Sequence, residues 1–222
     1  KWGMRATLGA IEKVEINNDQ VTYQTINNGK PRGICGSGLI DCIYELARNR
    51  IISQDGKFDL SLSNPRISIE NNIPQYILAF PDETEAEQAI TITEIDIDNL
   101  IKSKGAVFAA VKSLIDYVGL KFTQLDTIYL AGGFGSSLDI RKAIAIGLLP
   151  DIDTRRIRFI GNSSVMGARM ALLSSRAFEA TRSIARRMTN IELSTYVPFM
   201  NEFIAALFLP HTDNQLFPSV HY

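Results

Sequence analysis

The residues best suited to chemistry form a glycine-rich turn between an expected strand and an expected helix. The segment Ile128–Ser137 reads IYLAGGFGSS, in which an apolar run ends in a pair of glycines. Because glycine has no Cβ and adopts positive φ at little cost, the main chain there can pass close to a ribose or a phosphate. The N-terminus of the following helix offers unpaired N–H groups and a positive dipole end to a phosphate. We predict that this turn lines the ribose and α-phosphate of a nucleotide through Gly132, Gly133, Phe134, Gly135 and Ser136. The alternative is a tight turn that needs glycine for packing alone.

A second glycine-rich turn precedes another expected helix. Gly33–Gly38 reads GICGSG, and apolar residues at helical spacing follow it. Main-chain amides and a serine hydroxyl at a helix start suit a phosphate or a ribose. The turn is not a P-loop, because no Lys-Ser or Lys-Thr pair follows it. We predict that Gly36, Ser37 and Gly38 support the ribose or phosphate side, since two such turns at separate strand–helix junctions favour one shared cleft.

Two further features have both a structural and a functional interpretation. Gly161–Ala168 reads GNSSVMGA, and its small residues favour tight helix packing over direct ligand contact. Lys104 lies in the first turns of the helix before the Gly-Gly strand, where a solvated face is the ordinary role of a lysine. The alternative is a contact near the base of the nucleotide, and on that alternative we include Lys104 in the predicted site.

Other kinds of site find no support in the residue types. His211 and His221 are the only histidines, and neither has the carboxylate or thiol spacing of a metal site. Cys35 and Cys42 are seven residues apart, which on a helix is beyond disulfide reach, so free thiols are expected. The arginines lack interleaved aromatic residues, which argues against nucleic-acid binding. No residue of the chain can be named as catalytic.

Strands and helices are expected to alternate along the chain. The patterns of the first half predict a β-hairpin over 9–17 and 21–26, a helix over 39–52, a turn-rich stretch at 55–72, and strands at 75–80 and 89–93. A helix is predicted next, from Asp96 or Asp98 to Val118, with Gly119 as its stop. The second half predicts a buried strand at 127–131, a helix at 138–147, a buried strand at 158–160, a long helix to Met188, a strand at 191–196 and a helix at 198–207. Such alternation, with glycine-rich turns at strand ends, is typical of an α/β fold whose sheet edge faces a ligand cleft. The stretch 67–101 has acidic residues but no Lys or Arg, and we expect a solvated acidic edge there, with an acidic docking patch as the alternative.

The composition is that of an ordinary globular protein. Of 222 residues, 45% are hydrophobic and 21% charged, and a net charge of −1 gives no general attraction to nucleic acid or to anionic membranes. No apolar stretch is long enough for a membrane span or a signal peptide, so a cytoplasmic location is expected. The chain opens on Lys-Trp-Gly without an initiator methionine, and we therefore expect a fragment of a longer protein.

Several motifs taken together resemble one known family. The Gly-Gly-Phe-Gly junction followed by GNSSVMGA resembles the adenosine-binding end of the actin/Hsp70/sugar-kinase ATPases. The full combination is similar to the ATP-dependent reductive activators of corrinoid proteins, including the activating enzymes of O-demethylase systems. It is carried, over nearly the whole chain, by Trp2–Ala6, Gly9–Glu12, Gly33–Asp41, Ala131–Gly135 and Phe208–Asp213.

The resemblance implies an α/β fold, namely the C-terminal lobe of an actin-like (ribonuclease H-like) ATPase domain, with a mixed sheet flanked by helices. Residues 1–30 would form a β-hairpin, 31–190 the nucleotide-binding core with inserted strands at 55–95, and 191–222 a C-terminal strand, helix and tail. The family also has two Asp-x-Gly-Thr phosphate hairpins, which handle Mg²⁺, and an N-terminal [2Fe-2S] domain. No Asp-x-Gly-Thr string occurs in this sequence, so the fragment is expected to lack the phosphate hairpins and to be inactive by itself.

The implied function is ATP binding for an iron–sulfur activase that returns Co(II) corrinoid proteins to Co(I) in methyl-transfer systems. The implied cofactors are ATP with Mg²⁺ and, outside this chain, a [2Fe-2S] cluster. The implied partners are a corrinoid protein and an electron donor for the cluster, and assembly into a homodimer is left open. The alternatives are another ATPase of the superfamily, such as a small-molecule kinase or a dehydratase activator, or a non-enzymatic actin-like assembly module.

Overall fold

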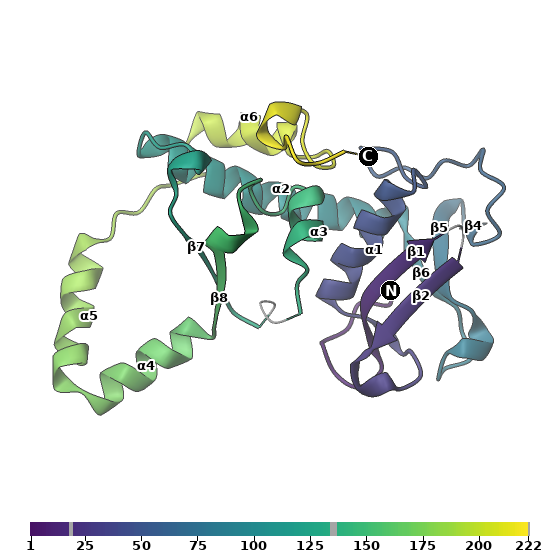
Figure 1. Ribbon diagram of the computed structural model, residues 1–222, viewed down its shortest axis with the longest axis horizontal. Helices are drawn as coiled ribbons and strands as arrows, with labels where there is room; N and C mark the ends of the chain where they lie inside the picture. Colours follow the sequence, from purple (N-terminus) through teal and green to yellow (C-terminus); the bar gives the residue numbers. More distant parts are fainter. Residues whose placement is uncertain (18–19, 134–136, 222) are drawn as a thin grey trace.

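The computed structural model describes residues 1–17, 20–133 and 137–221, and within them the strands group into three small sheets (Figure 1). The strand orders are β2-β1-β3, β4-β5-β6 and β7-β8. Short 3-10 helices occupy Ile26–Asn28, Pro81–Glu83, Phe122–Gln124, Thr154–Arg156 and Asn214–Leu216. No helix of the described residues is both long enough and apolar enough to cross a membrane.

The first sheet contains the predicted hairpin. Strand β1 (Ala10–Asn17) pairs antiparallel with β2 (Gln20–Thr25) and parallel with the short β3 (Gly33–Ile34). The β3 register with β1 covers only its first two residues. Beyond them, one edge of β1 lacks a neighbouring strand among the described residues, and side chains from a helix satisfy it instead, as described below.

Helix α1 (Gly36–Arg48) packs on this sheet through apolar residues at helical spacing, among them Ile40, Ile43 and Leu46. It begins at Gly36, whereas the sequence placed its start near residue 39 and treated the glycines as a turn. That boundary prediction was wrong, because the three glycine-motif residues already have helical backbone.

The second sheet is a meander of β4 (Ile67–Glu70), β5 (Ile73–Ala79) and β6 (Ile90–Thr93). The last two strands were predicted, but β4 was assigned to a turn-rich stretch. Asn71 and Asn72 join β4 to β5 with φ of 51° and 63°, the left-handed pair that a two-residue hairpin turn requires. This Asn-Asn pair was the available signal for β4.

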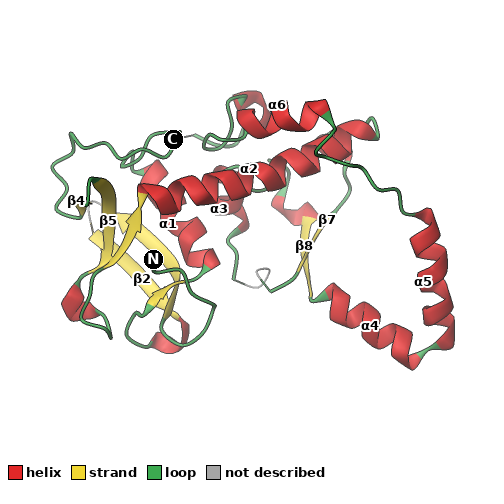
Figure 2. Cartoon of the chain, turned by 180° about the vertical axis from the view of Figure 1, so that it is seen from behind, coloured by secondary structure: helices red, strands yellow, loops and turns green. Residues whose placement is uncertain are grey.

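Helix α2 (Glu94–Tyr117) runs along most of the molecule (Figure 2). Its N-cap is Thr93, so the predicted cap at Asp96 or Asp98 was wrong by a turn; Asp96 instead completes a capping box with Thr93. The predicted end is confirmed, since Val118 is the C-cap and Gly119 follows with φ of +72°.

The third sheet pairs β7 (Ile128–Ala131) in parallel with β8 (Ile157–Gly161), and α3 (Ile140–Ala145) lies between them in sequence. Both strands were predicted to be buried, and this was wrong. Burial alternates along β7, and Tyr129 and Phe159 are 59% and 38% exposed. Only one face of this two-stranded sheet is packed, through Ile128 and Leu130.

The predicted long helix is two helices, α4 (Ser163–Leu173) and α5 (Ser175–Arg187), broken at Ser174 in an extended conformation. They extend away from the other helices (Figures 1 and 2), and neither contains a buried residue. The preferred packing interpretation of Gly161–Ala168 was therefore wrong, since a Cβ added at Gly161 or Gly167 would meet no atom within 4 Å.

The C-terminal region contains α6 (Val197–Ala205), with Pro198 in its first turn as predicted. The strand predicted at 191–196 was wrong: these residues form turns and pair with no strand. Helix α6 lies against α2, and the close approach needs glycine at position 105, where a Cβ would lie 3.1 Å from the Ala206 carbonyl oxygen.

Two hydrophobic clusters share helix α2. The larger one combines β1, α1, β5 and β6 with Ile97 and Ile101 of α2. The smaller one combines α3 and β8 with Phe108 of α2 and Phe217 near the C-terminus. Helix α2 therefore connects the part that carries α1 to the part that carries α3.

Candidate functional site

A pocket of about 680 Å³ lies where the N-terminal segment, the start of α1 and the loop after β7 meet. Its lining residues are Gly3, Met4, Arg5, Ala6, Cys35, Gly36, Ser37, Gly133 and Ser137. The structure thus brings residues of both predicted glycine motifs, which are about a hundred positions apart in sequence, to one pocket.

The α1 wall presents the beginning of a helix. The first N–H groups of a helix have no acceptor within it, and the N-cap residue Cys35 makes no side-chain cap hydrogen bond. The Cys35 Sγ atom instead lies 3.3 Å from both the Ile11 carbonyl oxygen and the Ser37 Oγ atom. The N–H groups of Gly36 and Ser37 and the positive end of the helix dipole therefore suit an anionic group.

Gly38 has a different role from its two neighbours. It is buried, it does not line the pocket, and a Cβ at this position would lie 2.2 Å from the Ile11 carbonyl oxygen. Glycine is required there because α1 crosses β1 at backbone contact distance. The structure gives Gly38 a packing role rather than the predicted ligand role.

The N-terminal segment forms a wall that the residue patterns did not identify as a site. The Met4 N–H donates to the Ile34 carbonyl and the Ile34 N–H donates to the Trp2 carbonyl, each at 2.9 Å, which fixes the segment beside β3. Arg5 is the one charged residue among the described residues that line the pocket. Its guanidinium suits a phosphate. Long-range pairing brings Arg5 there, and although Trp2–Ala6 contributed to the family resemblance, no local pattern predicted a ligand role for it.

The Gly-Gly wall has open space in front of it. Gly132 has φ of 113°, a conformation that L-residues rarely adopt, and its N–H donates to the Gly161 carbonyl at 2.8 Å. A Cβ added at Gly132 or Gly133 would meet no described atom within 4 Å, so intramolecular packing does not explain either glycine. Phe134, Gly135 and Ser136 lie outside the described residues, and their predicted roles stay predictions.

Lys104 does not line this pocket. Its side chain is 1% exposed, and its ammonium donates to the carbonyl oxygens of Phe208 and, at 2.6 Å, of Pro210. Burial lowers the pKa of Lys104 to about 7, because the charged form is removed from water. The ordinary solvated role was wrong. The alternative, a contact near the base, has no support here, since the ammonium is held by main-chain oxygens.

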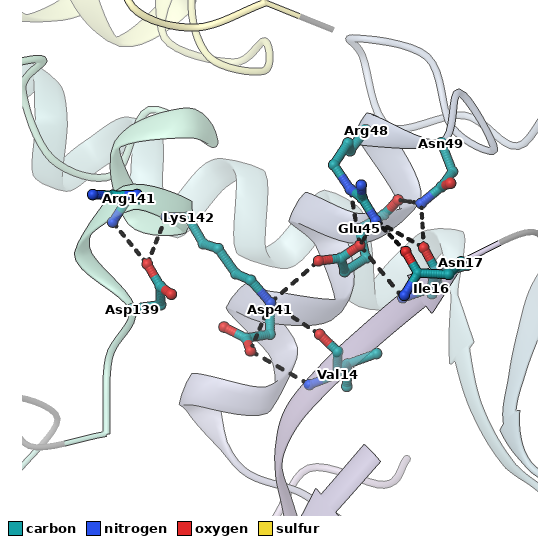
Figure 3. Close-up of polar contacts among 10 residues, drawn as sticks. All are labelled: Val14, Ile16, Asn17, Asp41, Glu45, Arg48, Asn49, Asp139, Arg141 and Lys142. Carbon is teal, nitrogen blue, oxygen red and sulfur yellow. Dashed lines mark hydrogen bonds and ion pairs between the residues drawn. The ribbon is translucent and has the colours of Figure 1, made fainter. Parts of the chain in front are cut away.

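Charged side chains satisfy the open edge of β1 (Figure 3). Asp41 Oδ2 and Glu45 Oε2, both on α1, accept from the N–H groups of Val14 and Ile16 at 3.4 Å. Arg48 donates to the Ile16 carbonyl at 2.8 Å and to Glu45 Oε2 at 2.7 Å. These side chains occupy the place of a neighbouring strand and pair the backbone groups that would otherwise be buried without partners.

A lysine from α3 joins the same cluster. Lys142 Nζ lies 3.0 Å from Asp41 Oδ2, 3.2 Å from Glu45 Oε1 and 2.9 Å from the Val14 carbonyl oxygen (Figure 3). Burial raises the pKa of Asp41, and the Lys142 ammonium offsets part of the rise. Burial by itself would lower the pKa of Lys142, but the two carboxylates raise it overall. Burial also raises the pKa of the nearby Cys42 thiol, which keeps that group neutral.

The chain's own residues do not fit a metal or an iron–sulfur site. Among the described residues, no three His, Cys, Asp or Glu side chains gather as metal ligands, and the described pocket lining contains no carboxylate. A [2Fe-2S] cluster takes four protein ligands, whereas the sequence has two cysteines, both buried and unpaired. A nucleotide does fit, because the pocket combines a helix start, a cation and an open glycine.

Comparisons with known proteins bear on the family and the fold of this chain. A family model described as the C-terminal domain of RACo, the ASKHA domain, matches residues 1–221. The solved structure of a reductive activator for corrinoid, iron–sulfur protein is 48% identical in sequence and superposes with a TM-score of 0.93. The match covers 99% of this chain and 35% of the activator's chain. The corrinoid activation enzyme RamQ of Eubacterium limosum is 34% identical over 91% of this chain and 35% of its own length. A Co(II) methylated amine-specific corrinoid protein reductase of Methanosarcina barkeri is 30% identical over 53% of this chain and 22% of its own length. The chain thus spans about a third or less of each of these proteins.

Proposed function

Because this chain belongs to the family described as the C-terminal domain of RACo, the ASKHA domain, we propose that it binds ATP for a protein that reductively activates corrinoid proteins. In that protein, Co(II) corrinoid would be returned to Co(I), and ATP would drive the conformational cycle. The relatives named as corrinoid activators or reductases support this assignment. The corrinoid protein would be the partner, together with an electron donor, and a homodimer is part of the same proposal.

The observation that carries the proposal is the pocket shared by the two glycine motifs. Its volume of about 680 Å³ falls in the range of small-molecule sites. Arg5 and the N–H groups of Gly36 and Ser37 would hold phosphate groups, and the open main chain at Gly133 would lie against the ribose or α-phosphate. ATP would supply the binding energy that separates two conformations of the intact protein.

That role requires a difference in affinity between the two conformations. A nucleotide that binds both equally shifts neither, however tightly it binds. A pocket with walls from two hydrophobic clusters meets this requirement, because a change in the spacing of the walls changes the number of contacts with the nucleotide. The Mg²⁺ ligands and the cluster would be supplied by other parts of the protein, since the residues that the structure describes provide no group of metal ligands.

Gly133→Val in the intact protein tests the proposed site. The substitution puts an isopropyl group into the open space of the pocket, and it brings no backbone strain because the φ of Gly133 lies outside the left-handed region. We expect the affinity for a non-hydrolysable ATP analogue with Mg²⁺, measured by calorimetry, to fall at least tenfold. Gly133→Ala should have a smaller effect, and Ala180→Val on the exposed helix α5 should have none.

The same variants test the activity. Formation of Co(I) from a Co(II) corrinoid protein, followed by its visible absorption in the presence of ATP and reductant, should be lost in parallel with nucleotide affinity. Equal affinity of Gly133→Val and the parent protein would remove this pocket as the nucleotide site.

A further inference from the structure

The two walls of the pocket lead mainly into different hydrophobic clusters, and Leu138, which follows Ser137, packs against both. The wall formed by Gly36 and Ser37 begins α1, whose apolar side packs into the larger cluster with β1. The wall formed by Gly133 and Ser137 leads into α3, whose Ala143 and Ile144 pack into the smaller cluster. The width of the pocket therefore depends on how α1 and α3 are held relative to each other.

A short path of rigid structure leads from each wall to the same ion cluster. On one side, Asp41 follows Ser37 by about one turn of α1. On the other side, Asp139 caps α3 by accepting from the N–H of Lys142 at 3.1 Å, and Lys142 follows Ser137 by five residues. Lys142 Nζ then contacts Asp41 and Glu45 of α1 (Figure 3).

Burial makes this connection stiff. Asp41 and Glu45 are 4% and 3% exposed, and the Lys142 side chain is 15% exposed. Charge-assisted bonds are strong when water is largely excluded, and three oxygens around one ammonium fix its position. The carboxylates are held independently of α3, because Val14 and Ile16 donate to them and Arg48 binds Glu45.

We propose that Lys142 is a positioning residue that sets the spacing of the two pocket walls by joining α3 to α1. Lys142 does not line the pocket, so its effect on the nucleotide is transmitted through the helices. The inference rests on the proposed nucleotide site and adds to it the residue that determines how well the site is preorganised.

Arg48 offers a matched control. Arg48 is the second cation bound to the Glu45 carboxylate, with its guanidinium nitrogen 2.7 Å from Glu45 Oε2. Its other hydrogen bonds go to Ile16 and Asn17 of β1, and among the described residues it makes none to α3. Replacing Lys142 or Arg48 by methionine removes one positive charge from the cluster in either case. Only the first replacement removes the ion pairs between α3 and α1, and the apolar contacts of Leu138 and Ile146 with the larger cluster remain in both variants.

The experiment compares four variants of the intact protein with the parent, namely Lys142→Met, Lys142→Arg, Arg48→Met and the double variant Asp41→Asn/Lys142→Met. Lys142→Met alone leaves the buried Asp41 carboxylate without its cation, which can unfold the protein. The double variant removes that unpaired charge as well and so keeps the protein folded. We expect the dissociation constant of a non-hydrolysable ATP analogue to rise at least tenfold in both Lys142→Met variants. The dissociation constant should rise less than threefold in Lys142→Arg and less than twofold in Arg48→Met. These limits hold even where the free energy of unfolding, measured in urea, differs between the variants.

A readout without nucleotide separates this inference from the proposed site. Hydrogen exchange across 137–146 should be faster in the Lys142→Met variants than in Arg48→Met and the parent protein. Parent-like affinity and exchange in the double variant would overturn the positioning role and leave the nucleotide site standing, as would an equal loss of affinity in Arg48→Met. If the parent protein binds no nucleotide, the proposed site fails, and the positioning role fails with it.

Discussion

Lys104 is a lysine ammonium almost completely removed from water. It pairs with main-chain carbonyl oxygens and, among the residues that the structure describes, with no carboxylate, so no opposite charge there offsets the loss of hydration. Burial lowers its pKa to about 7, because the charged form loses its hydration. At neutral pH the cost of burying this charge therefore lowers the free energy of unfolding of the chain.

The pH dependence of stability should reveal this lysine. An unfolded lysine keeps its proton up to its ordinary pKa of 10.5, so between about pH 7 and 10.5 the unfolded chain binds more protons than the folded one. The free energy of unfolding should accordingly rise with pH across that window, by at most about 5 kcal/mol, and be independent of this group below it. Urea titrations of the parent protein and Lys104→Met at pH 7 and pH 10 measure the difference. Parallel pH profiles would contradict a depressed pKa.

Glycines with the same sequence context perform different tasks in this chain. Gly38 lies against the Ile11 carbonyl oxygen, whereas Gly133 faces open space in a pocket. The sequence predicted ligand contact for both, since a glycine before a helix is compatible with either role. Only the position of the neighbouring strand distinguishes them, and that position depends on long-range packing.

At the level of elements, Thr93 ends β6 and begins α2. Its Oγ1 atom accepts from the Asp96 N–H at 3.2 Å, and Asp96 Oδ2 accepts from the Thr93 N–H at 3.0 Å. Thr93→Ala removes the first of these bonds and should lower the free energy of unfolding by about 1 kcal/mol. Thr93→Ser keeps the hydroxyl and should lose less than half of that. Equal losses in denaturant titrations of the two variants would point to the methyl group rather than the cap.

The elements that the sequence predicted correctly carry their own signals. Burial alternates along β1 from Val14 to Asn17 and along β2 from Gln20 to Gln24, and Gly119 follows the end of α2 with positive φ. The failures depend on partners. Residues 191–196 alternate like a strand but have no strand to pair with, and the run through 163–187 is helical except at Ser174, whose hydroxyl caps the next helix. The spacing of apolar residues shows which face of a segment can be buried, but the contacts made by the rest of the chain determine whether another element packs on that face.

For the whole molecule, the sequence predicted that the two glycine motifs would meet in one cleft, but it did not predict the side chains that support the candidate site. Both motifs were found because each has a local reason to contain glycine. Neither Arg5 nor Lys142 had such a local reason. Arg5 reaches the pocket because its neighbours Trp2 and Met4 pair with Ile34 of β3, and Lys142 meets Asp41 across 101 residues of sequence. Contacts of that range are consequences of the complete fold, with α2 as the element shared by both clusters.

Because the pocket lies between two clusters, nucleotide binding should protect both walls together. The first N–H groups of α1 have no acceptor within the helix and should exchange quickly in the free protein. With an ATP analogue at a hundred times its dissociation constant, linkage stabilises the folded state by about 2.7 kcal/mol. We expect slower hydrogen exchange at 36–38 and at 131–139 of the intact protein, with no change along the exposed helix α5. Protection of one wall alone would mean that the nucleotide contacts a single cluster, and the differential affinity required for an ATP-driven cycle would then have no basis in this pocket.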